Sequence, residues 1–268
     1  MNDNCGSNII YLTTDCNMSC DYCYEKSNRD KLDKPQVATK HKIDSFLMDI
    51  VNRESDQSQH VVVIFGGEPF LKYDLIKYLI NKGLELGNFC YSLTTNGTVL
   101  VRKKILFDFI KYYYSIKNKV ALSLELSYDA SGNFRRIYSN GKSTDADILR
   151  LMRYLCIAKI PFVLRYTVTK SNYLNLETDI ESLVEQFDKI YKVQFSLCWS
   201  EFESKEYITK YVNDASLRLY KKYNIPMCEQ VCDLCKKCDR SSKYNFYYTV
   251  NNKIQVEKTK QGGFNHFV

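Results

Sequence analysis

The chain has 268 residues, of which 45% are hydrophobic and 26% charged, as in a soluble globular protein with one large domain or one domain plus a small appendage. It contains no apolar run long enough to span a bilayer, and residues 1–5 lack the basic and apolar regions of a secretory signal, so we expect a cytoplasmic protein with no membrane partner. The net charge of +7 comes from scattered lysines rather than from a basic block, which argues against nucleic acid as a partner.

Strand-like and helix-like segments alternate over the first two hundred residues. Apolar runs rich in β-branched residues predict six strands, at residues 8–14, 60–65, 90–95, 119–129, 161–169 and 192–200. Apolar residues at helical spacing predict helices between them, around residues 43–51, 75–80, 106–113, 148–155 and 176–187. Strands joined by helical crossovers run in the same direction, so this order predicts a parallel α/β sheet.

The third to sixth predicted strands each have one polar face. Its members in strand order are Ser92, Thr94 and Asn96; Ser123, Glu125, Ser127 and Asp129; Arg165, Thr167 and Thr169; and Gln194, Ser196 and Cys198. A helix-covered parallel sheet normally has apolar residues on both faces. We therefore expect a concave interior that holds a polar ligand, as at the mouth of a curved α/β barrel. An antiparallel sheet with this face in solvent is the alternative, which the intervening helices disfavour.

Seven of the eleven cysteines fall into two tight clusters, and such clusters in a chain of this kind bind metal more often than they form disulfides. The first cluster, Cys16, Cys20 and Cys23, directly follows the first predicted strand. Three thiolates on one short loop can hold three corners of a [4Fe–4S] cubane and leave the fourth iron open. Zinc is the alternative, but it prefers four ligands and no nearby histidine completes the set.

The loop Cys16-Asn17-Met18-Ser19-Cys20-Asp21-Tyr22-Cys23-Tyr24 resembles the signature of radical S-adenosylmethionine (SAM) enzymes, and its flanking residues are similar to those of the peptide-modifying branch. The resemblance covers about residues 8–200. It implies a partial (β/α)6 barrel over residues 1–200, followed by a C-terminal extension over residues 201–268. It also implies that the open iron binds SAM, that reductive cleavage of SAM yields a 5′-deoxyadenosyl radical, and that Tyr22 packs near the adenine.

Gly66-Gly67-Glu68-Pro69, at the end of the second predicted strand, is similar to the family's GGEP motif, which binds the amino group of the methionine moiety. Two glycines would let backbone carbonyls approach an ammonium group closely, and Pro69 would fix the exit of the chain.

Two further motifs resemble cofactor-binding elements of the family. The stretch 94–98 is similar to its T-N-G-T stretch, which implies that Thr94 and Asn96 lie at the cofactor. Residues 127–129 resemble its S-x-D element, in which a serine (here Ser127) helps to bind the ribose or carboxylate; Ala130 stands where the family usually has glycine. Arg136 or Arg165 could pair with the cofactor carboxylate. Arg165 is preferred because it lies on the inward polar face, and a surface salt bridge is the alternative for either arginine.

The second cysteine cluster places four thiols within eleven residues: Cys228, Cys232, Cys235 and Cys238. It resembles the SPASM and twitch extensions of radical SAM enzymes and predicts one auxiliary [4Fe–4S] cluster, with zinc as the alternative and Cys198 as a substitute ligand. Residues 244–250 and 253–258 predict an antiparallel hairpin packed over the barrel mouth.

The favoured function is therefore hydrogen abstraction from a peptide or protein side chain, as in ribosomal-peptide maturases, with an electron donor such as flavodoxin or ferredoxin. Candidate substrate contacts are Glu125, Asp129, Gln194, Ser196 and Trp199. A small-molecule substrate and a glycyl-radical activase are the enzymatic alternatives. A zinc-stabilised nucleic-acid-binding module is the non-enzymatic one.

Overall fold

A computed structural model describes residues 7–55, 59–229, 244–248 and 254–258. All six predicted strands are confirmed to within about three residues at each end. They are β1 (Ser7–Tyr11), β2 (His60–Phe65), β3 (Phe89–Thr95), β4 (Ala121–Ser127), β5 (Phe162–Val168) and β6 (Ile190–Leu197). Each is parallel to its neighbour in sequence, which confirms the predicted parallel sheet.

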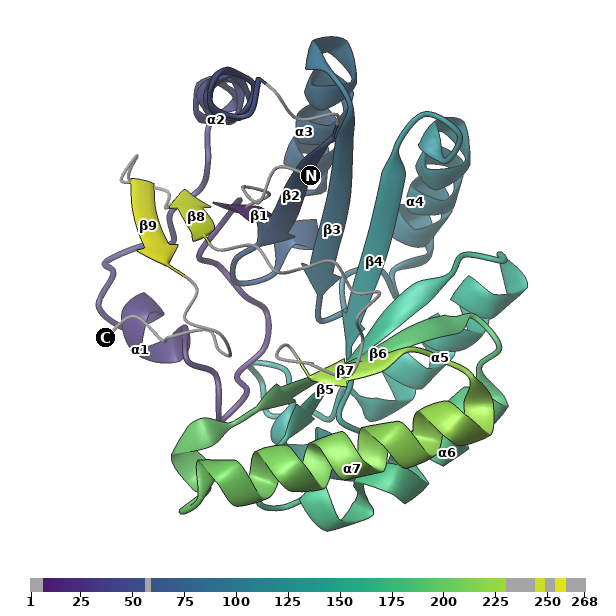
Figure 1. The fold of residues 1–268 in the computed structure, drawn as a ribbon. Coiled ribbons are helices and arrows are strands. Elements are labelled where there is room, and N and C mark those ends of the chain that lie inside the picture. The colour runs from purple at the N-terminus through teal and green to yellow at the C-terminus, as the bar shows by residue number, and fades with distance from the viewer. Residues whose placement is uncertain (1–6, 56–58, 230–243, 249–253, 259–268) are drawn as a thin grey trace.

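The five predicted helices are also confirmed: α2 (Lys40–Arg53), α3 (Tyr73–Leu86), α4 (Lys103–Ile116), α5 (Asp145–Ile157) and α6 (Leu176–Gln186). Each buries the apolar stripe that its sequence predicted; in α2, for example, Ile43, Leu47 and Ile50 are fully buried. Figure 1 shows these helices along the outside of a curved sheet that does not close on itself. The fold is thus an open α/β barrel with a helical outer layer.

Residues beyond 200 extend both edges of this sheet. Helix α7 (Lys205–Tyr223) leads to the short strand β7 (Met227–Glu229), which pairs with β6. The predicted C-terminal hairpin is confirmed as β8 (Tyr244–Tyr248) and β9 (Ile254–Lys258), which pair in antiparallel fashion. Its predicted position over the barrel mouth is wrong, because β8 pairs with the free edge of β1. The order is β7-β6-β5-β4-β3-β2-β1-β8-β9.

The parallel arrangement brings the carboxyl ends of the six strands to one rim of the barrel. The cysteine loop follows β1, the Gly-Gly-Glu-Pro turn follows β2, and Asn96 follows β3. Asp129 lies two residues beyond the end of β4. A short helix, α1 (Lys26–Arg29), comes directly after the cysteine loop. The segments that carry the sequence motifs therefore meet at one place.

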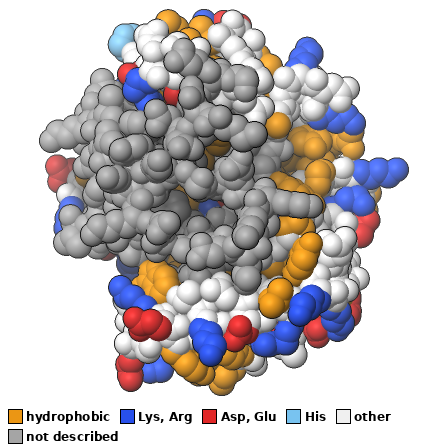
Figure 2. Space-filling view, viewed as in Figure 1, with side chains coloured by type: hydrophobic (Ala, Val, Ile, Leu, Met, Phe, Trp, Pro, Cys, Tyr) orange, Lys and Arg blue, Asp and Glu red, His pale blue; other side chains and the backbone are white. Residues whose placement is uncertain are grey.

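The described surface carries no basic block on the face seen in Figure 2, where Lys and Arg side chains alternate with Asp and Glu. This agrees with the scattered lysines of the sequence. Within the described parts of the chain, no helix is both long and apolar enough to cross a membrane.

Candidate active site

The three cysteines of the first cluster are free, half-buried thiols on the loop after β1. Burial raises the pKa of Cys16 and that of Cys20, the latter to about 11, and the neighbouring thiols raise them further. The three thiols, all on this one loop, thus affect one another's charge. Each thiol also has a hydrogen-bond donor or a cation beside it: Asn96 Nδ2 lies 3.7 Å from Cys16 Sγ, Arg29 lies 3.9 Å from Cys23 Sγ, and the charge of Arg136 acts on Cys20.

The Gly-Gly pair packs directly against the backbone of the cysteine loop. Gly66 has φ 134°, and a Cβ there would lie 2.4 Å from the carbonyl oxygen of Thr13; at Gly67 it would lie 2.1 Å from that of Asp15. The backbone N–H of Gly67 donates to Thr13 and that of Glu68 to Asp15, both at 2.8 Å. The glycines therefore let β2 and its turn dock onto the start of the loop, a role that the sequence analysis did not foresee.

Glu68 joins the turn after β2 to the end of β3. Its buried carboxylate accepts hydrogen bonds from the backbone N–H of Asn96 at 2.8 Å and the hydroxyl of Thr95 at 2.7 Å. It also accepts a hydrogen bond from the N–H of Phe70, so Glu68 is the N-cap of the 3₁₀-helix η1 (Pro69–Lys72). Burial raises the pKa of Glu68 to about 6. Its side chain thus serves to hold two rim segments together, with Pro69 at the start of η1.

Asn96 and Asn17 connect the end of β3 to the cysteine loop. The Asn96 amide donates to Asn17 Oδ1 at 3.2 Å, and the Asn17 amide donates to the hydroxyl of Thr98 at 2.7 Å. Asn96 Oδ1 in turn accepts from the N–H of Thr98. The structure therefore places Asn96 at the loop, beside Cys16 and Asn17.

On its other side, the loop pairs with the segment that follows the 3₁₀-helix η2 (Ala130–Arg135). Met18 and Tyr138 form an antiparallel bridge, and the N–H of Ser19 donates to the carbonyl of Ile137 at 2.9 Å. Met18 is buried. The cysteine loop is thus held between the glycine turn and residues 137–139.

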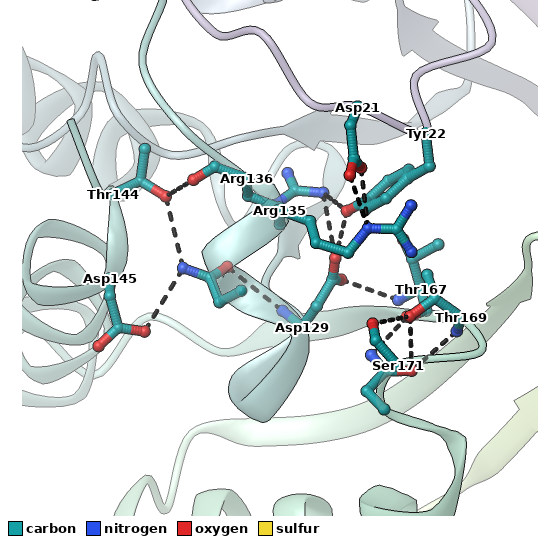
Figure 3. A network of polar contacts seen from close by, with 12 residues as sticks. Asp21, Tyr22, Asp129, Arg135, Arg136, Thr144, Asp145, Thr167, Thr169 and Ser171 are labelled. Atoms are coloured by element: carbon teal, nitrogen blue, oxygen red, sulfur yellow. Dashed lines mark hydrogen bonds and ion pairs between the residues drawn. The ribbon is translucent and has the colours of Figure 1, made fainter. Parts of the chain in front are cut away.

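A buried polar network joins Tyr22 to the end of β4 (Figure 3). The Tyr22 hydroxyl donates to Asp129 Oδ2 and accepts from Arg136 at 2.8 Å, and Arg136 lies 3.8 Å from the same carboxylate. Asp129 Oδ1 accepts from the backbone N–H of Thr167 on β5 at 2.9 Å. Burial raises the pKa of Tyr22 and of Asp129. Asp129 is a predicted substrate contact, and in this structure it anchors Tyr22.

Arg135 ties the same loop to the segment after β6. Its guanidinium donates to Asp21 at 2.9 Å and to Glu201 at 2.7 Å, and it lies 5.2 Å from the centre of the Tyr22 ring. Its polar partners follow β1 and β6, the first and the last of the six barrel strands. The arginine therefore bridges the rim of the open barrel.

A second network lies on the predicted inner polar face. The buried Glu125 of β4 accepts hydrogen bonds from Ser92 and from Thr94, the latter at 3.0 Å, and forms an ion pair with Arg165 of β5 at 2.8 Å. Arg165 and Thr94, both predicted to bind the cofactor, thus contact Glu125 in this structure. Of the two arginines considered, Arg136 rather than Arg165 lies beside the cysteine loop.

Two further predicted residues lie around the end of β4. Ser127 is half-buried and pairs in register with Arg165. Ala130 begins η2 with φ 43°, a left-handed conformation. This explains why the family usually has glycine there, and it shows that alanine still makes the turn.

The second cysteine cluster lies mostly outside the described residues. Cys228 belongs to β7, where its backbone pairs with Gln194, while Cys232, Cys235 and Cys238 fall within the undescribed segment 230–243. Cys198 is half-buried after β6, with its thiol 3.6 Å from Glu201 Oε1.

The fold and the rim motifs define a radical SAM protein, and comparison with known families agrees. The family model of the radical SAM superfamily matches residues 10–192, and the chain belongs to this superfamily. The radical SAM fold binds SAM and a [4Fe–4S] cluster.

Among curated relatives, the chain is 31% identical to the uncharacterized protein MJ0907 of Methanocaldococcus jannaschii over 66% of this chain and 57% of that protein. It is 26% identical to the putative glycyl-radical enzyme activating enzyme MJ1632 of the same organism, over 79% of this chain and 80% of that one. SuiB of Streptococcus suis, solved with the precursor peptide SuiA, shares the fold with a TM-score of 0.66 and 17% identity over 94% of this chain and 59% of SuiB. The chain thus spans little more than half the length of MJ0907 and of SuiB.

The residues present fit the cofactors of this family. Cysteine thiols bind iron only in their deprotonated form. Asn96, Arg29 and Arg136 lie beside the three sulfurs, and hydrogen-bond donors and cations of this kind stabilise the negative charge of cluster ligands. Among the described residues, no three His, Cys, Asp or Glu side chains converge as ligands of one metal ion. A cubane presents a separate iron to each thiolate, so it does not require such convergence.

Proposed function

We propose that Cys16, Cys20 and Cys23 ligate a [4Fe–4S] cluster and that the chain is a radical SAM enzyme acting on a peptide or protein side chain. The observation that supports the cluster site most directly is the docking of the cysteine loop between the glycine turn and residues 137–139. This docking, together with the electrostatic effect of the neighbouring thiols on Cys16 and Cys20, supports a shared cluster site on one loop. When bound, the cluster and SAM supply reductive cleavage of the sulfonium and hydrogen abstraction from the substrate.

The chain's own residues would hold and orient these groups. Asn96 donates toward Cys16 and Arg136 places a positive charge near Cys20, so both would stabilise ligated thiolates. Tyr22 is fixed by Asp129 and would present its ring to the adenine. Gly66–Pro69 and Ser127 are the further candidates for contact with SAM.

The experiment that tests this proposal is anaerobic reconstitution with iron and sulfide. We expect a brown protein with broad charge-transfer absorption that releases 5′-deoxyadenosine from SAM in the presence of a reductant. Replacing Cys16, Cys20 and Cys23 with alanine should abolish this release. A colourless protein that binds zinc and no iron would instead support the non-enzymatic alternative.

The peptide substrate is supported by the shared fold with SuiB, which was solved with its precursor peptide. The glycyl-radical activase is the second candidate, favoured by the match to MJ1632 over about four fifths of both chains. The two predict different products: a maturase alters the peptide covalently, whereas an activase leaves a glycyl radical that is visible by electron paramagnetic resonance. A small-molecule substrate would give neither.

We also propose that the C-terminal cysteines, Cys228, Cys232, Cys235 and Cys238, hold an auxiliary [4Fe–4S] cluster. Their density in the sequence supports it. Iron content separates this from a zinc site: the variant lacking Cys16, Cys20 and Cys23 should retain about four irons per chain if the auxiliary cluster is present.

An acidic flavodoxin or ferredoxin is the proposed electron donor, and a basic hollow beside the cysteine loop supports it. The hollow has a volume of about 520 Å³, and its charged lining residues are three lysines and one acid: Lys31, Lys34, Lys42 and Asp33. The segment that forms it is anchored on the loop at both ends. Arg29 contacts Cys23 Sγ at 3.9 Å, and the carbonyl of Gln36 accepts from the N–H of Thr14 at 3.0 Å.

A further inference from the structure

The arginines near the cysteine loop and the inner polar face differ in whether a carboxylate balances their charge. Ion pairs join Arg135 to Asp21 and Glu201, Arg136 to Asp129, and Arg165 to Glu125. Arg29 forms no ion pair with any carboxylate in the described ranges of the chain, and its guanidinium lies 3.9 Å from Cys23 Sγ. A cation without a partner keeps its full field at neighbouring groups, whereas a carboxylate largely cancels the field of a paired one.

The backbone after the cysteine loop holds Arg29 against the thiols. The carbonyl of Cys23 accepts from the N–H of Lys26 at 3.0 Å, so the chain turns directly into α1. The N–H of Arg29 donates to the carbonyl of Glu25 at 2.9 Å, which fixes its position at the end of this helix. The charge of Arg29 also acts on Cys16. One half-buried guanidinium therefore affects two of the three cysteines.

Such a charge has a definite effect on a cluster at this loop. A [4Fe–4S] core on three thiolates carries a net charge of about −1, which becomes about −2 when the core takes up one electron. A nearby cation stabilises the more negative state. Net charge and hydrogen bonds to the sulfurs are among the factors that set the reduction potential of such clusters.

We propose that Arg29 raises the reduction potential of the cluster held by Cys16, Cys20 and Cys23, a role that rests on the proposed function. Arg29 acts through the sulfur that it contacts, so it is a positioning residue rather than a catalytic one. Arg136 contributes less to the potential, because the carboxylate of Asp129 lies 3.8 Å from it and opposes its charge.

The test is an electrochemical titration of the anaerobically reconstituted protein, followed by electron paramagnetic resonance of the reduced cluster. The signal that changes when SAM is added belongs to the cysteine loop, which separates it from any C-terminal cluster. At the midpoint potential of the wild type, Arg29→Met should show about tenfold less reduced than oxidised cluster, a shift of about 59 mV for one electron. Arg29→Lys should stay close to the wild type, since it keeps the charge.

Arg53→Gln is the matched control, because it removes one positive charge at the opposite end of β1, where Arg53 contacts Asn8 at 2.9 Å. It should leave the potential unchanged. Iron content and circular dichroism establish that each variant carries the cluster and is folded, and Arg29→Gln serves as a second neutral variant should Arg29→Met fail to assemble.

An unchanged potential in the neutral Arg29 variants would overturn the proposal. An equal shift in Arg53→Gln would overturn it as well, since the net charge of the protein would then be responsible. A shift in Arg29→Lys as large as that in Arg29→Met would show that the charge is not what acts. A wild-type protein that binds no iron would instead reject the proposed cluster site itself, so the two failures are distinguishable.

Discussion

The hydroxyl of Tyr22 donates a hydrogen bond to the carboxylate of Asp129, which joins the cysteine loop to the end of β4. Asp129 is fully buried and Tyr22 partly buried, and Arg136 contacts both of them. The residue whose ring is expected at the adenine is therefore also a structural tether of the loop.

Tyr22→Phe separates these two roles, because it keeps the ring and removes the tether. Leaving the Asp129 carboxylate without this donor should lower the free energy of unfolding by about 1–3 kcal/mol. Denaturant unfolding measures the change. Tyr207→Phe on the exposed face of α7 is the control and should be neutral. A Tyr22→Phe protein as stable as the wild type would mean that the hydroxyl contributes nothing to holding the loop.

Gly67→Ala should disturb the cysteine loop, since the added Cβ would lie 2.1 Å from the backbone oxygen of Asp15. Backbone atoms cannot move aside as a flexible side chain can, so we expect a loss of about 1–3 kcal/mol and a lower iron content after reconstitution. Gly87→Ala is the matched control, because its Cβ would meet only a ring carbon of Phe89 at 3.9 Å. Equal iron content in the two variants would contradict the docking role of Gly67.

The sequence could predict the strands and the motifs because their signals are local. The β-branched runs marked β1–β6, and the helical spacing of Ile208, Val212, Ala215 and Leu219 would have revealed α7 as well. The sequence could not predict which residues contact one another across neighbouring strands. Only the register brings Arg165 to Glu125, and nothing in the alternation of β8 indicates that it joins the edge of β1. Sequence likewise does not reveal that the backbone of the cysteine loop lies against the Gly-Gly pair.

Ala130→Gly should stabilise the protein. Alanine at φ 43° carries the steric penalty of a left-handed conformation, which glycine avoids, so we expect a gain of about 1 kcal/mol in the free energy of unfolding. Ala121→Gly, at an exposed strand position, should instead destabilise because glycine loses more backbone entropy on folding. Urea unfolding of both variants tests the contrast, and a loss of stability in both would refute it.

Glu68 should make stability depend on pH. Its pKa is about 6 in the folded protein against an ordinary value of 4.5, so its protonated form stabilises the fold below pH 4.5 and this contribution is lost as the pH rises through about 6. The shift corresponds to about 2 kcal/mol. The free energy of unfolding of the wild type relative to Glu68→Gln should therefore fall over this range and level off above it. Glu203→Gln provides the control, and a pH-independent difference between wild type and Glu68→Gln would contradict the prediction.

Electron delivery through the basic hollow predicts an effect that depends on the reductant. The double variant Lys31→Glu/Lys34→Glu reverses two charges that line the hollow while leaving the cysteine loop itself unaltered. With a reduced acidic flavodoxin at low salt, the rate of cluster reduction should fall about tenfold or more, because charge complementarity sets the encounter rate. With dithionite the rate should stay close to that of the wild type, since a small reductant needs no docking surface.

The matched control for this experiment is Lys117→Glu/Lys119→Glu, which makes the same change in charge just before β4, at the opposite end of the strands from the rim. Raising the salt concentration should reduce the difference between the wild type and the hollow variant, because it screens exposed charges. If both double variants slow flavodoxin equally, the overall charge of the protein rather than the hollow governs the encounter. If the hollow variant is also slow with dithionite, the lysines act on the cluster itself and the docking proposal is wrong.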